Sequence, residues 1–297
     1  MSEGTGGGAE VFDARRCALG EGPLWHPDRG ELLWFDILAG RLLASDGVAA
    51  REWALGEMAS AAALTAHRDR LLVATETALV LLDLETGARE TICALEPDRP
   101  AVRSNDGRAD PWGGFWISTM GKKGGEADGQ AVSAIFRWHG GELRRLHDRL
   151  TVPNAICFDR GRARAYFADT PTQTIRRQPL HPDTGWPEGE AETHIDLSAT
   201  SHRPDGAVTD AEGHLWSAQW GSGRVARYDP EGRFLGAVAI PGLNSSCPAF
   251  GGPAFTTLFC TTARQGLDEA QDRDEAQGRT FAIPGAGRGA PEPRVAL

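Results

Sequence analysis

The segment WHPDRGELLWFD, residues 25–36, runs from an apolar residue through Pro and Asp to a turn glycine and then an aromatic-rich stretch. Three later segments repeat this order: ADPWGGFWIS from Ala109, FDRGRARAYFADT from Phe158 and TDAEGHLWSAQW from Thr209. A fifth copy, LTAHRDRLLVATE from Leu64, keeps the shape without the glycine. A turn and strand that recur in one order are typical of a repeat architecture.

The spacing of the copies indicates the kind of repeat. The turn positions are 39, 44, 48 and 52 residues apart, at Gly30, Asp69, Gly113, Gly161 and Gly213. Several copies continue into a second turn, as in LLDLETGAR and ARYDPEGR, which predicts an antiparallel meander in each repeat. With a last, degenerate copy from about Ser245, the sequence predicts an all-β, six-bladed β-propeller with about four antiparallel strands per blade. A five-bladed propeller stays open because the last copy is weak.

The composition is that of a globular protein without a nucleic-acid or membrane partner. Of the 297 residues 40% are hydrophobic and 24% charged, and no apolar run approaches the roughly 18 residues needed to span a bilayer. The net charge of −10 would repel a phosphate backbone. Residues 1–10 lack the basic and apolar regions of a signal peptide, so we expect a flexible tail, one domain over 11–297 and a cytoplasmic location.

The cysteines and tryptophans are expected to serve the core. The five cysteines show no C-x-x-C spacing, which favours buried free thiols in a reducing compartment. Trp34, Trp116 and Trp216 occupy matching strands, and packing between blades explains them better than ligand stacking.

Four polar residues stand at nearly the same place in four copies. Glu21 lies nine residues before its turn glycine, Asn105 and Asp205 eight, and Asn154 seven. Equivalent positions of successive blades form a ring around the propeller axis, so these side chains are predicted to meet there. Each alone is better explained as a turn residue, but four at one phase favour a shared site.

The chemistry of this set favours a cation. Two carboxylates and two amide carbonyls suit a hard divalent ion such as Ca²⁺, Mg²⁺ or Mn²⁺. The eight histidines show no H-x-H or H-E-x-x-H spacing. G-x-S-x-G and a strand-linked G-x-G-x-x-G are also missing from the sequence, which weakens a serine-hydrolase or dinucleotide-binding interpretation.

These segments resemble the SMP-30/gluconolactonase/LRE-like family of regucalcin-like sugar lactonases. The resemblance runs from about Arg15 to Arg294 and includes LGEGPLWHPDRGELLWFDI, VRSNDGRADPWGGFWISTMGKK, VPNAICFDRGRARAYFAD and RPDGAVTDAEGHLWSAQW. It implies metal ligands at Glu21, Asn154 and Asp205, and substrate-binding residues at Arg103 and Asn105.

The resemblance implies metal-dependent hydrolysis of an aldono- or aldarolactone to the sugar acid, an activity of carbohydrate metabolism. One divalent ion, Ca²⁺ first and otherwise Zn²⁺, Mn²⁺, Mg²⁺ or Fe²⁺, would polarise the lactone carbonyl. Asp205 is expected to act as general base on water, although water activation by the ion alone stays open. The alternatives are a diisopropylfluorophosphatase-like ester or phosphotriester hydrolase and a non-catalytic calcium-binding propeller. The expected assembly is a monomer or weak homodimer.

Lys122 and Lys123 mark a departure from the family, because some members carry an acidic, substrate-facing residue there. A solvated loop, with Glu126 a little further on, is the simpler interpretation. If Lys122 instead points inward and binds substrate, it would favour a lactone that carries a carboxylate. His202, close in sequence to Asp205, is a weaker candidate for substrate contact.

Overall fold

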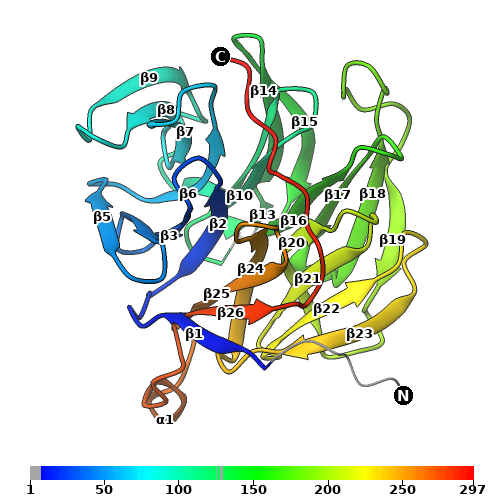
Figure 1. Ribbon diagram of the computed structural model, residues 1–297. Coiled ribbons are helices and arrows are strands. Elements are labelled where there is room, and N and C mark those ends of the chain that lie inside the picture. Colours follow the sequence, from blue (N-terminus) through cyan, green and yellow to red (C-terminus); the bar gives the residue numbers. More distant parts are fainter. Residues whose placement is uncertain (1–7, 125, 128–129) are drawn as a thin grey trace.

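The computed structural model describes residues 8–124, 126–127 and 130–297. Within these ranges the strands form six four-stranded antiparallel sheets and one two-stranded hairpin, arranged as blades around a central axis (Figure 1). The prediction of a six-bladed propeller is confirmed, and the five-bladed alternative is excluded. No helix in the described part of the chain has the length and apolar character needed to cross a membrane.

The first three blades follow one another along the chain, each running from the axis outward. Blade 1 contains β2 (Gly20–His26), β3 (Glu31–Asp36), β4 (Arg41–Ser45) and β5 (Ala50–Ala54). Blade 2 contains β6 (Ala59–Leu64), β7 (Arg70–Thr75), β8 (Ala78–Asp83) and β9 (Arg89–Ala94). Blade 3 contains β10 (Val102–Ala109), β11 (Phe115–Gly121), β14 (Ser133–His139) and β15 (Glu142–Leu150), with the hairpin β12 (Glu126–Ala127) and β13 (Gln130–Ala131) inserted.

The next two blades repeat this plan, and the last is built from both ends of the chain. Blade 4 contains β16 (Pro153–Asp159), β17 (Arg164–Asp169), β18 (Thr174–Pro179) and β19 (Glu192–Asp196), with a 3₁₀ turn, η1, at Thr170–Thr172. Blade 5 contains β20 (Arg203–Thr209), β21 (Leu215–Trp220), β22 (Arg224–Tyr228) and β23 (Phe234–Ala239). Blade 6 contains β24 (Asn244–Gly251), β25 (Thr257–Ala263), β26 (Thr280–Pro284) and the N-terminal β1 (Glu10–Asp13), with a short helix α1 at Glu269–Asp272.

The ring closes through blade 6, where β1 pairs antiparallel with β26 and Val11 faces Phe281. This pairing covers the outer edge of β26, which would otherwise be left open. Of the tail expected over residues 1–10, residues 1–7 lie outside the described ranges, and Glu10 begins β1.

The core lies between neighbouring blades. Trp34, Trp116 and Trp216 are buried on the second strands of blades 1, 3 and 5, as expected from packing between sheets. Each of the five cysteines is a free thiol, and four of them are buried, while Cys93 is partly exposed. The prediction that these residue types belong to the core is confirmed for the tryptophans and for four of the thiols.

The two ends of the propeller differ in construction. At the turn end, a tight turn joins the first and second strands of each blade. Gly30 and Gly213 adopt positive φ values of 66° and 85° there, whereas blade 4 uses Ala163 (φ 47°) instead of Gly161. At the opposite end, which we call the entry end, the innermost strands β2, β6, β10, β16, β20 and β24 begin.

The C-terminal segment, residues 285–297, crosses the turn end (Figure 1). Backbone hydrogen bonds tie it to four blades: Ala211 N–H donates to the Arg288 carbonyl, Val295 N–H to that of Leu64, Ala296 N–H to that of Gly113, and Gly289 N–H to that of Phe255. The segment therefore covers the turn end, whereas the predicted site lies at the entry end.

Candidate active site

The innermost strands place the predicted residues together at the entry end. Glu21 is the second residue of β2, Asn154 the second of β16 and Asp205 the third of β20. Arg103 and Asn105 are the second and fourth residues of β10. Arg103, Asn105, Asn154 and Asp205 are buried, and Glu21 is partly buried.

A β-bulge in each innermost strand orients these side chains. Pairing with the second strand shifts immediately after Glu21 in β2 and after Asn154 in β16. Asn105 and Asp205 lie inside the corresponding shifts of β10 and β20. The four residues therefore share a place but not one register. Counted to the left-handed turn residue, which is Ala163 in blade 4, the two residues before the shift stand nine residues away and the two inside it stand eight, so the count of seven came from using Gly161. Bulges of this kind turn a side chain away from the regular alternation of a strand.

The residues after Glu21 and Asn154 adopt left-handed backbone conformations. Gly22 has φ 55°, and a Cβ atom there would lie 2.2 Å from the carbonyl oxygen of Ser60 in blade 2. Ala155 has φ 57° although it carries a Cβ, a conformation that costs an alanine roughly 1 kcal/mol. Gly22 thus lets blades 1 and 2 approach closely beside Glu21.

Hydrogen bonds connect the polar side chains across three blades. Arg103 donates through Nη1 to Asn105 Oδ1 at 2.9 Å, and Asn105 Nδ2 donates to Asn154 Oδ1 at 2.9 Å. Asn154 Nδ2 donates to Thr170 Oγ1 at 2.9 Å, and the Thr170 hydroxyl donates to the Pro204 carbonyl at 2.7 Å. This chain fixes both amide groups and ends beside Asp205 on β20.

Three carboxylates in this cluster, those of Glu21, Asp106 and Asp205, have raised pKa values because neighbouring positive groups do not outweigh the cost of burying their charge. Burial, followed by the negative charge of Asp106, raises the pKa of Glu21 to about 8, while the Gly22 N–H and Arg103 oppose the shift. Burial, followed by the charges of Glu21 and Asp106, raises the pKa of Asp205 well above its ordinary value. Burial also raises the pKa of Asp106 to about 6. A bound cation would stabilise the ionised form of all three.

Arg103 supplies positive charge to this cluster. Burial lowers the pKa of its guanidinium to about 10, and the carboxylates of Glu21, Asp205 and Glu76 act in the opposite direction. Arg103 and Asn105, the two residues that the resemblance assigns to substrate binding, contact one another directly.

Asp106 was not singled out from the sequence. Its Oδ2 atom accepts a hydrogen bond from Ile156 N–H in blade 4 at 2.7 Å, within the bulge that follows Asn154. Asp106 stands seven residues before Gly113, as Asn154 stands seven before Gly161, so the same count could have found it. A pattern with one polar residue per blade includes Asn105 and therefore omits its neighbour Asp106.

Lys122, for which a solvated loop was the simpler interpretation and substrate contact the alternative, lies at the same end. Lys122 follows β11, and its Nζ atom lies 2.7 Å from Glu76 Oε2 in blade 2. Lys122 and Lys123 are both exposed, and Glu126 falls in the short strand β12. His202 precedes β20, and its Nδ1 lies 3.1 Å from Ser222 Oγ.

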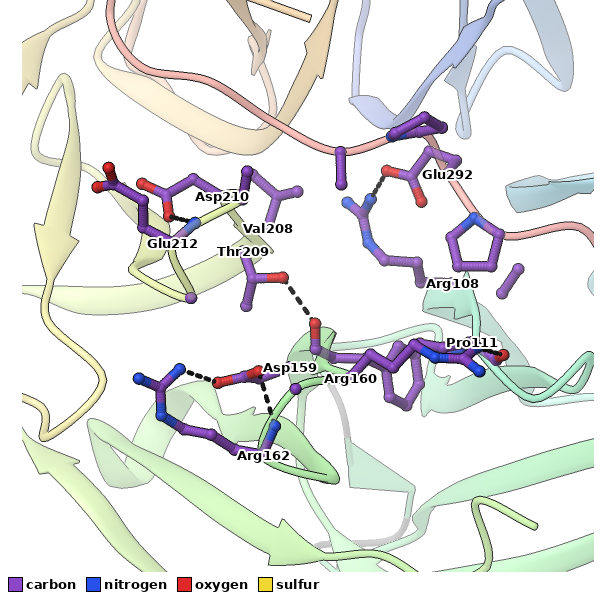
Figure 2. A pocket seen from close by; sticks show the side chains of 18 of the residues that line it. Arg108, Pro111, Asp159, Arg160, Arg162, Val208, Thr209, Asp210, Glu212 and Glu292 are labelled. Carbon is purple, nitrogen blue, oxygen red and sulfur yellow. Dashed lines mark hydrogen bonds and ion pairs between the residues drawn. The ribbon is translucent and has the colours of Figure 1, made fainter. Parts of the chain in front are cut away.

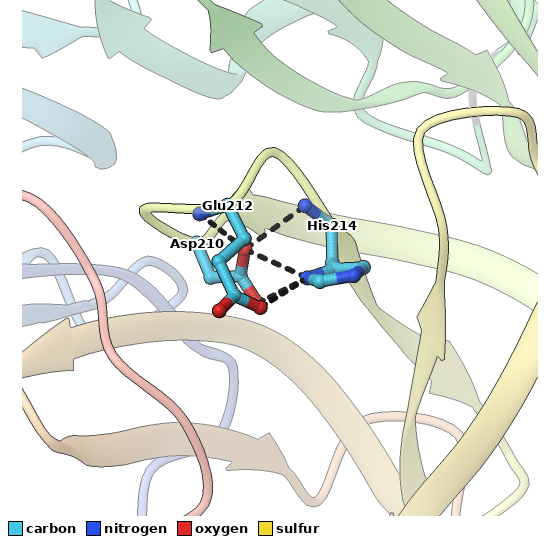
Figure 3. A group of neighbouring side chains, drawn as sticks. All are labelled: Asp210, Glu212 and His214. Atoms are coloured by element: carbon cyan, nitrogen blue, oxygen red, sulfur yellow. Dashed lines mark hydrogen bonds and ion pairs between the residues drawn. The ribbon is translucent and has the colours of Figure 1, made fainter.

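A second group that could hold a cation lies at the turn end. The ligand atoms of Asp210, Glu212 and His214 lie within 4.8 Å of one another on the turn between β20 and β21 (Figure 3). However, Asp210 Oδ2 already accepts hydrogen bonds from Trp216 Nε1 at 3.0 Å and Arg227 Nη2 at 3.2 Å. A cation there would compete with these donors.

A cavity of about 530 Å³ also lies at the turn end, between the turns of blades 3, 4 and 5 and residues 290–294 (Figure 2). Arg108 forms an ion pair with Glu292 on its border, and both side chains are nearly buried. Arg162 bonds Asp159 at 2.9 Å, and Thr209 donates to the Phe158 carbonyl at 2.6 Å. Glu21, Asn154 and Asp205 do not line this cavity.

Comparison with known proteins identifies the family of this chain. Residues 19–264 match the SMP-30/Gluconolactonase/LRE-like region. The pentonolactonase of Haloferax volcanii is 34% identical over 93% of this chain and 94% of its own length. The L-arabinolactonase of Azospirillum brasilense is 34% identical over 93% and 91%.

A solved structure shares both sequence and fold with this chain. The calcium-binding protein regucalcin of Agrobacterium tumefaciens is 37% identical, superposes with a TM-score of 0.93 and covers 98% of each chain. The match spans all six blades and therefore includes both ends of the propeller.

Proposed function

The chain belongs to the SMP-30/gluconolactonase/LRE-like family, and the relatives similar to it include two sugar lactonases. We propose that it hydrolyses a sugar lactone with a divalent cation bound at the entry end. Glu21, Asn154 and Asp205 would hold the cation. Ca²⁺ is the first expectation for the ion, given the similarity to calcium-binding regucalcin.

One observation carries this proposal: three carboxylates, of which Asp205 is buried and Glu21 and Asp106 are partly buried, lie close enough for their charges to interact, and burial favours the neutral form of each. Such an arrangement is costly unless a positive charge compensates it. The neighbouring amide groups of Asn105 and Asn154 add oxygen donors of the kind that hard cations prefer. The donor set therefore fits a divalent ion.

The protein's own residues would bind and orient the lactone. When bound, the cation would polarise the lactone carbonyl and stabilise negative charge on its oxygen. Arg103 would hold substrate oxygens through the guanidinium nitrogens that Asn105 does not occupy, and Asn105 would contact a hydroxyl group. Holding the ring in one pose places its carbonyl carbon within reach of water.

Asp205 would then move the proton. Its carboxylate takes a proton from the attacking water as the water oxygen bonds to the carbonyl carbon. The ring C–O bond breaks, and the proton passes to the departing ring oxygen, which becomes the new hydroxyl group. One water is consumed and a hydroxy acid is formed, with no other reactant.

The test is hydrolysis by cation-stripped protein, followed as acid release from a panel of aldono- and aldarolactones. Ca²⁺, Mn²⁺, Zn²⁺, Mg²⁺ and Fe²⁺ are then restored one at a time. Because lactones open spontaneously, Asp205→Asn in the same buffer is the control. We expect activity to vanish on stripping and return with at least one ion. Full activity in protein verified by elemental analysis to be cation-free would contradict the proposal.

A second candidate function is calcium binding without catalysis, which the similarity to regucalcin favours. It predicts cation binding at the same residues but no acceleration with any lactone or ester. Including phosphotriesters and simple esters in the panel also separates a lactonase from a broader ester hydrolase.

A further inference from the structure

The entry end carries an ion pair between two neighbouring blades, close to Arg103. Strand β7 ends at Thr75, which pairs with Ala59 at the start of β6, and Glu76 follows it. Strand β11 ends at Gly121, which pairs with Val102 at the start of β10, and Lys122 follows it. Glu76 and Lys122 therefore stand at the same end of the propeller as Arg103.

The contact between them is close and partly shielded from solvent. Lys122 Nζ lies 2.7 Å from Glu76 Oε2, and the side chains are 31% and 19% exposed. The Glu76 charge also acts on the Arg103 guanidinium, together with those of Glu21 and Asp205. A carboxylate at the entry end thus contacts the Lys122 ammonium and lies within electrostatic range of the Arg103 guanidinium.

We propose that Glu76 is a specificity-determining residue, which selects lactones with a neutral, hydroxyl-bearing tail over lactones that carry a second carboxylate. This inference rests on the proposed lactonase function. A carboxylate accepts hydrogen bonds from sugar hydroxyls, whereas it repels another carboxylate.

Lys122 is then a positioning residue. An unpaired ammonium at this place would attract an acidic lactone, but the Glu76 carboxylate offsets its charge. The pairing cancels the preference for an acidic lactone that an unpaired, inward-pointing lysine would give. It also holds Glu76 toward blade 3, where Arg103 begins the substrate-binding set.

The experiment compares kcat/KM for an aldonolactone and for the aldarolactone with the same ring stereochemistry. The variants are Glu76→Gln, which frees Lys122, and Lys122→Gln, which leaves Glu76 unpaired. We expect wild type to prefer the aldonolactone. Glu76→Gln should raise the acidic-to-neutral ratio about tenfold, and Lys122→Gln should lower it about threefold, as expected for charges a few ångströms apart near a protein surface.

Glu57→Gln is the matched control, since it removes the same charge from a nearby position. Glu57 contacts Thr77 Oγ1 at 3.1 Å and Arg89 at 3.9 Å, outside the Arg103 set. In Glu57→Gln, the ratio of kcat/KM for the acidic lactone to that for the neutral lactone should stay at the wild-type value. If Glu57→Gln shifts the ratio as much as Glu76→Gln, the effect is one of net charge and the role of Glu76 is refuted.

The outcomes separate this inference from the proposed function. Wild-type protein that hydrolyses neither lactone with any restored cation refutes the lactonase itself. Wild type that hydrolyses the aldonolactone while Glu76→Gln keeps the original ratio refutes only the role of Glu76. Calorimetric binding of the aldonate and aldarate products gives a second readout, which should shift in the same direction without turnover.

Discussion

The two ends of this propeller use acidic side chains in opposite ways. At the turn end, Asp110 and Asp210 accept hydrogen bonds from backbone N–H groups and from the guanidinium groups of Arg137 and Arg227. At the entry end, Glu21 and Asp205 are close to other carboxylates. Burial and repulsion between the negative charges raise the pKa values of both. A satisfied carboxylate stabilises the fold, whereas one that burial and repulsion disfavour indicates a missing positive partner.

The largest expected difference between the ends is in turnover. Asp205→Ala should lower kcat by about 10³-fold or more, because it removes the proposed cation ligand and the proposed general base together. Steady-state hydrolysis of a lactone, with cation content measured in parallel, tests this. Full activity in Asp205→Ala would remove this residue from the mechanism.

The opposite pattern is expected for Asp210→Ala. The change leaves Trp216 Nε1 and the His214 N–H without their acceptor, while the Arg227 guanidinium loses one partner and keeps Glu212 and His214. Buried donors that lose an acceptor cost about 2–4 kcal/mol in the free energy of unfolding. Urea denaturation should show this loss, while kcat of the folded protein stays near the wild-type value. Lost turnover in a stably folded Asp210→Ala would instead make the turn-end group functional.

The entry end also predicts a dependence of stability on pH. The ordinary pKa of Glu21 is 4.5, and the folded, cation-free protein raises it to about 8. Between these values the folded state keeps a proton that the unfolded chain has lost, so the contribution to stability falls as pH rises. Cation binding requires the deprotonated form, so the stabilisation by Ca²⁺ should grow over the same interval.

Thermal unfolding at pH 5 and pH 8, with chelator or with saturating Ca²⁺, measures this effect. We expect the difference between the two conditions to widen on the order of a few kcal/mol toward pH 8. Glu21→Gln should flatten the pH dependence of the cation-free protein. An equal Ca²⁺ effect at both pH values would argue that the carboxylates are already ionised.

Substrate binding gives the next contrast. Arg103→Ala should raise KM about 10- to 100-fold with a smaller change in kcat, because its guanidinium is expected to hold the lactone in both ground and transition states. Arg137→Ala at the turn end, which breaks the buried pair with Asp110, should lower stability and leave KM unchanged. Equal KM values for Arg103→Ala and wild type would exclude Arg103 from the substrate site.

The fold was largely predictable because its turns repeat locally along the sequence. The six-blade count followed from residues such as Gly30, Gly113 and Gly213, whose spacing requires no knowledge of distant contacts. Closure by β1 did not follow, because its partner β26 lies at the other end of the chain. A sequence pattern alone does not identify a pairing between such distant segments.

The site was predictable in composition but not in local geometry. Counting back from the turns identified Glu21, Asn105, Asn154 and Asp205, whose meeting place depends on the blade repeat. The bulges that orient them depend on pairing with the second strand, and Asp106 acts across a blade boundary through Ile156. The contact of Lys122 with Glu76 also joins two neighbouring blades, so the sequence around either residue could not predict it.

The smallest difference between the two ends is expected from substituting two aspartates that lie four residues apart in blade 3. Asp106 lies at the entry end and Asp110 at the turn end, where the Arg137 guanidinium neutralises it. Asp106→Asn keeps an oxygen that can accept from Ile156 N–H but removes one of the three negative charges at the proposed cation site. Ca²⁺ affinity, measured by calorimetry, should therefore fall about tenfold with little change in the stability of the cation-free protein.

Asp106→Ala separates charge from hydrogen bonding. It also leaves Ile156 N–H without its acceptor beside the strained Ala155, so stability should fall by a further ~1–2 kcal/mol. Asp110→Asn should lower stability without changing Ca²⁺ affinity, because its charge belongs to the turn-end pair. If Asp106→Asn binds Ca²⁺ as tightly as wild type, the Asp106 charge does not act on the cation, and Asp106 serves the bulge alone.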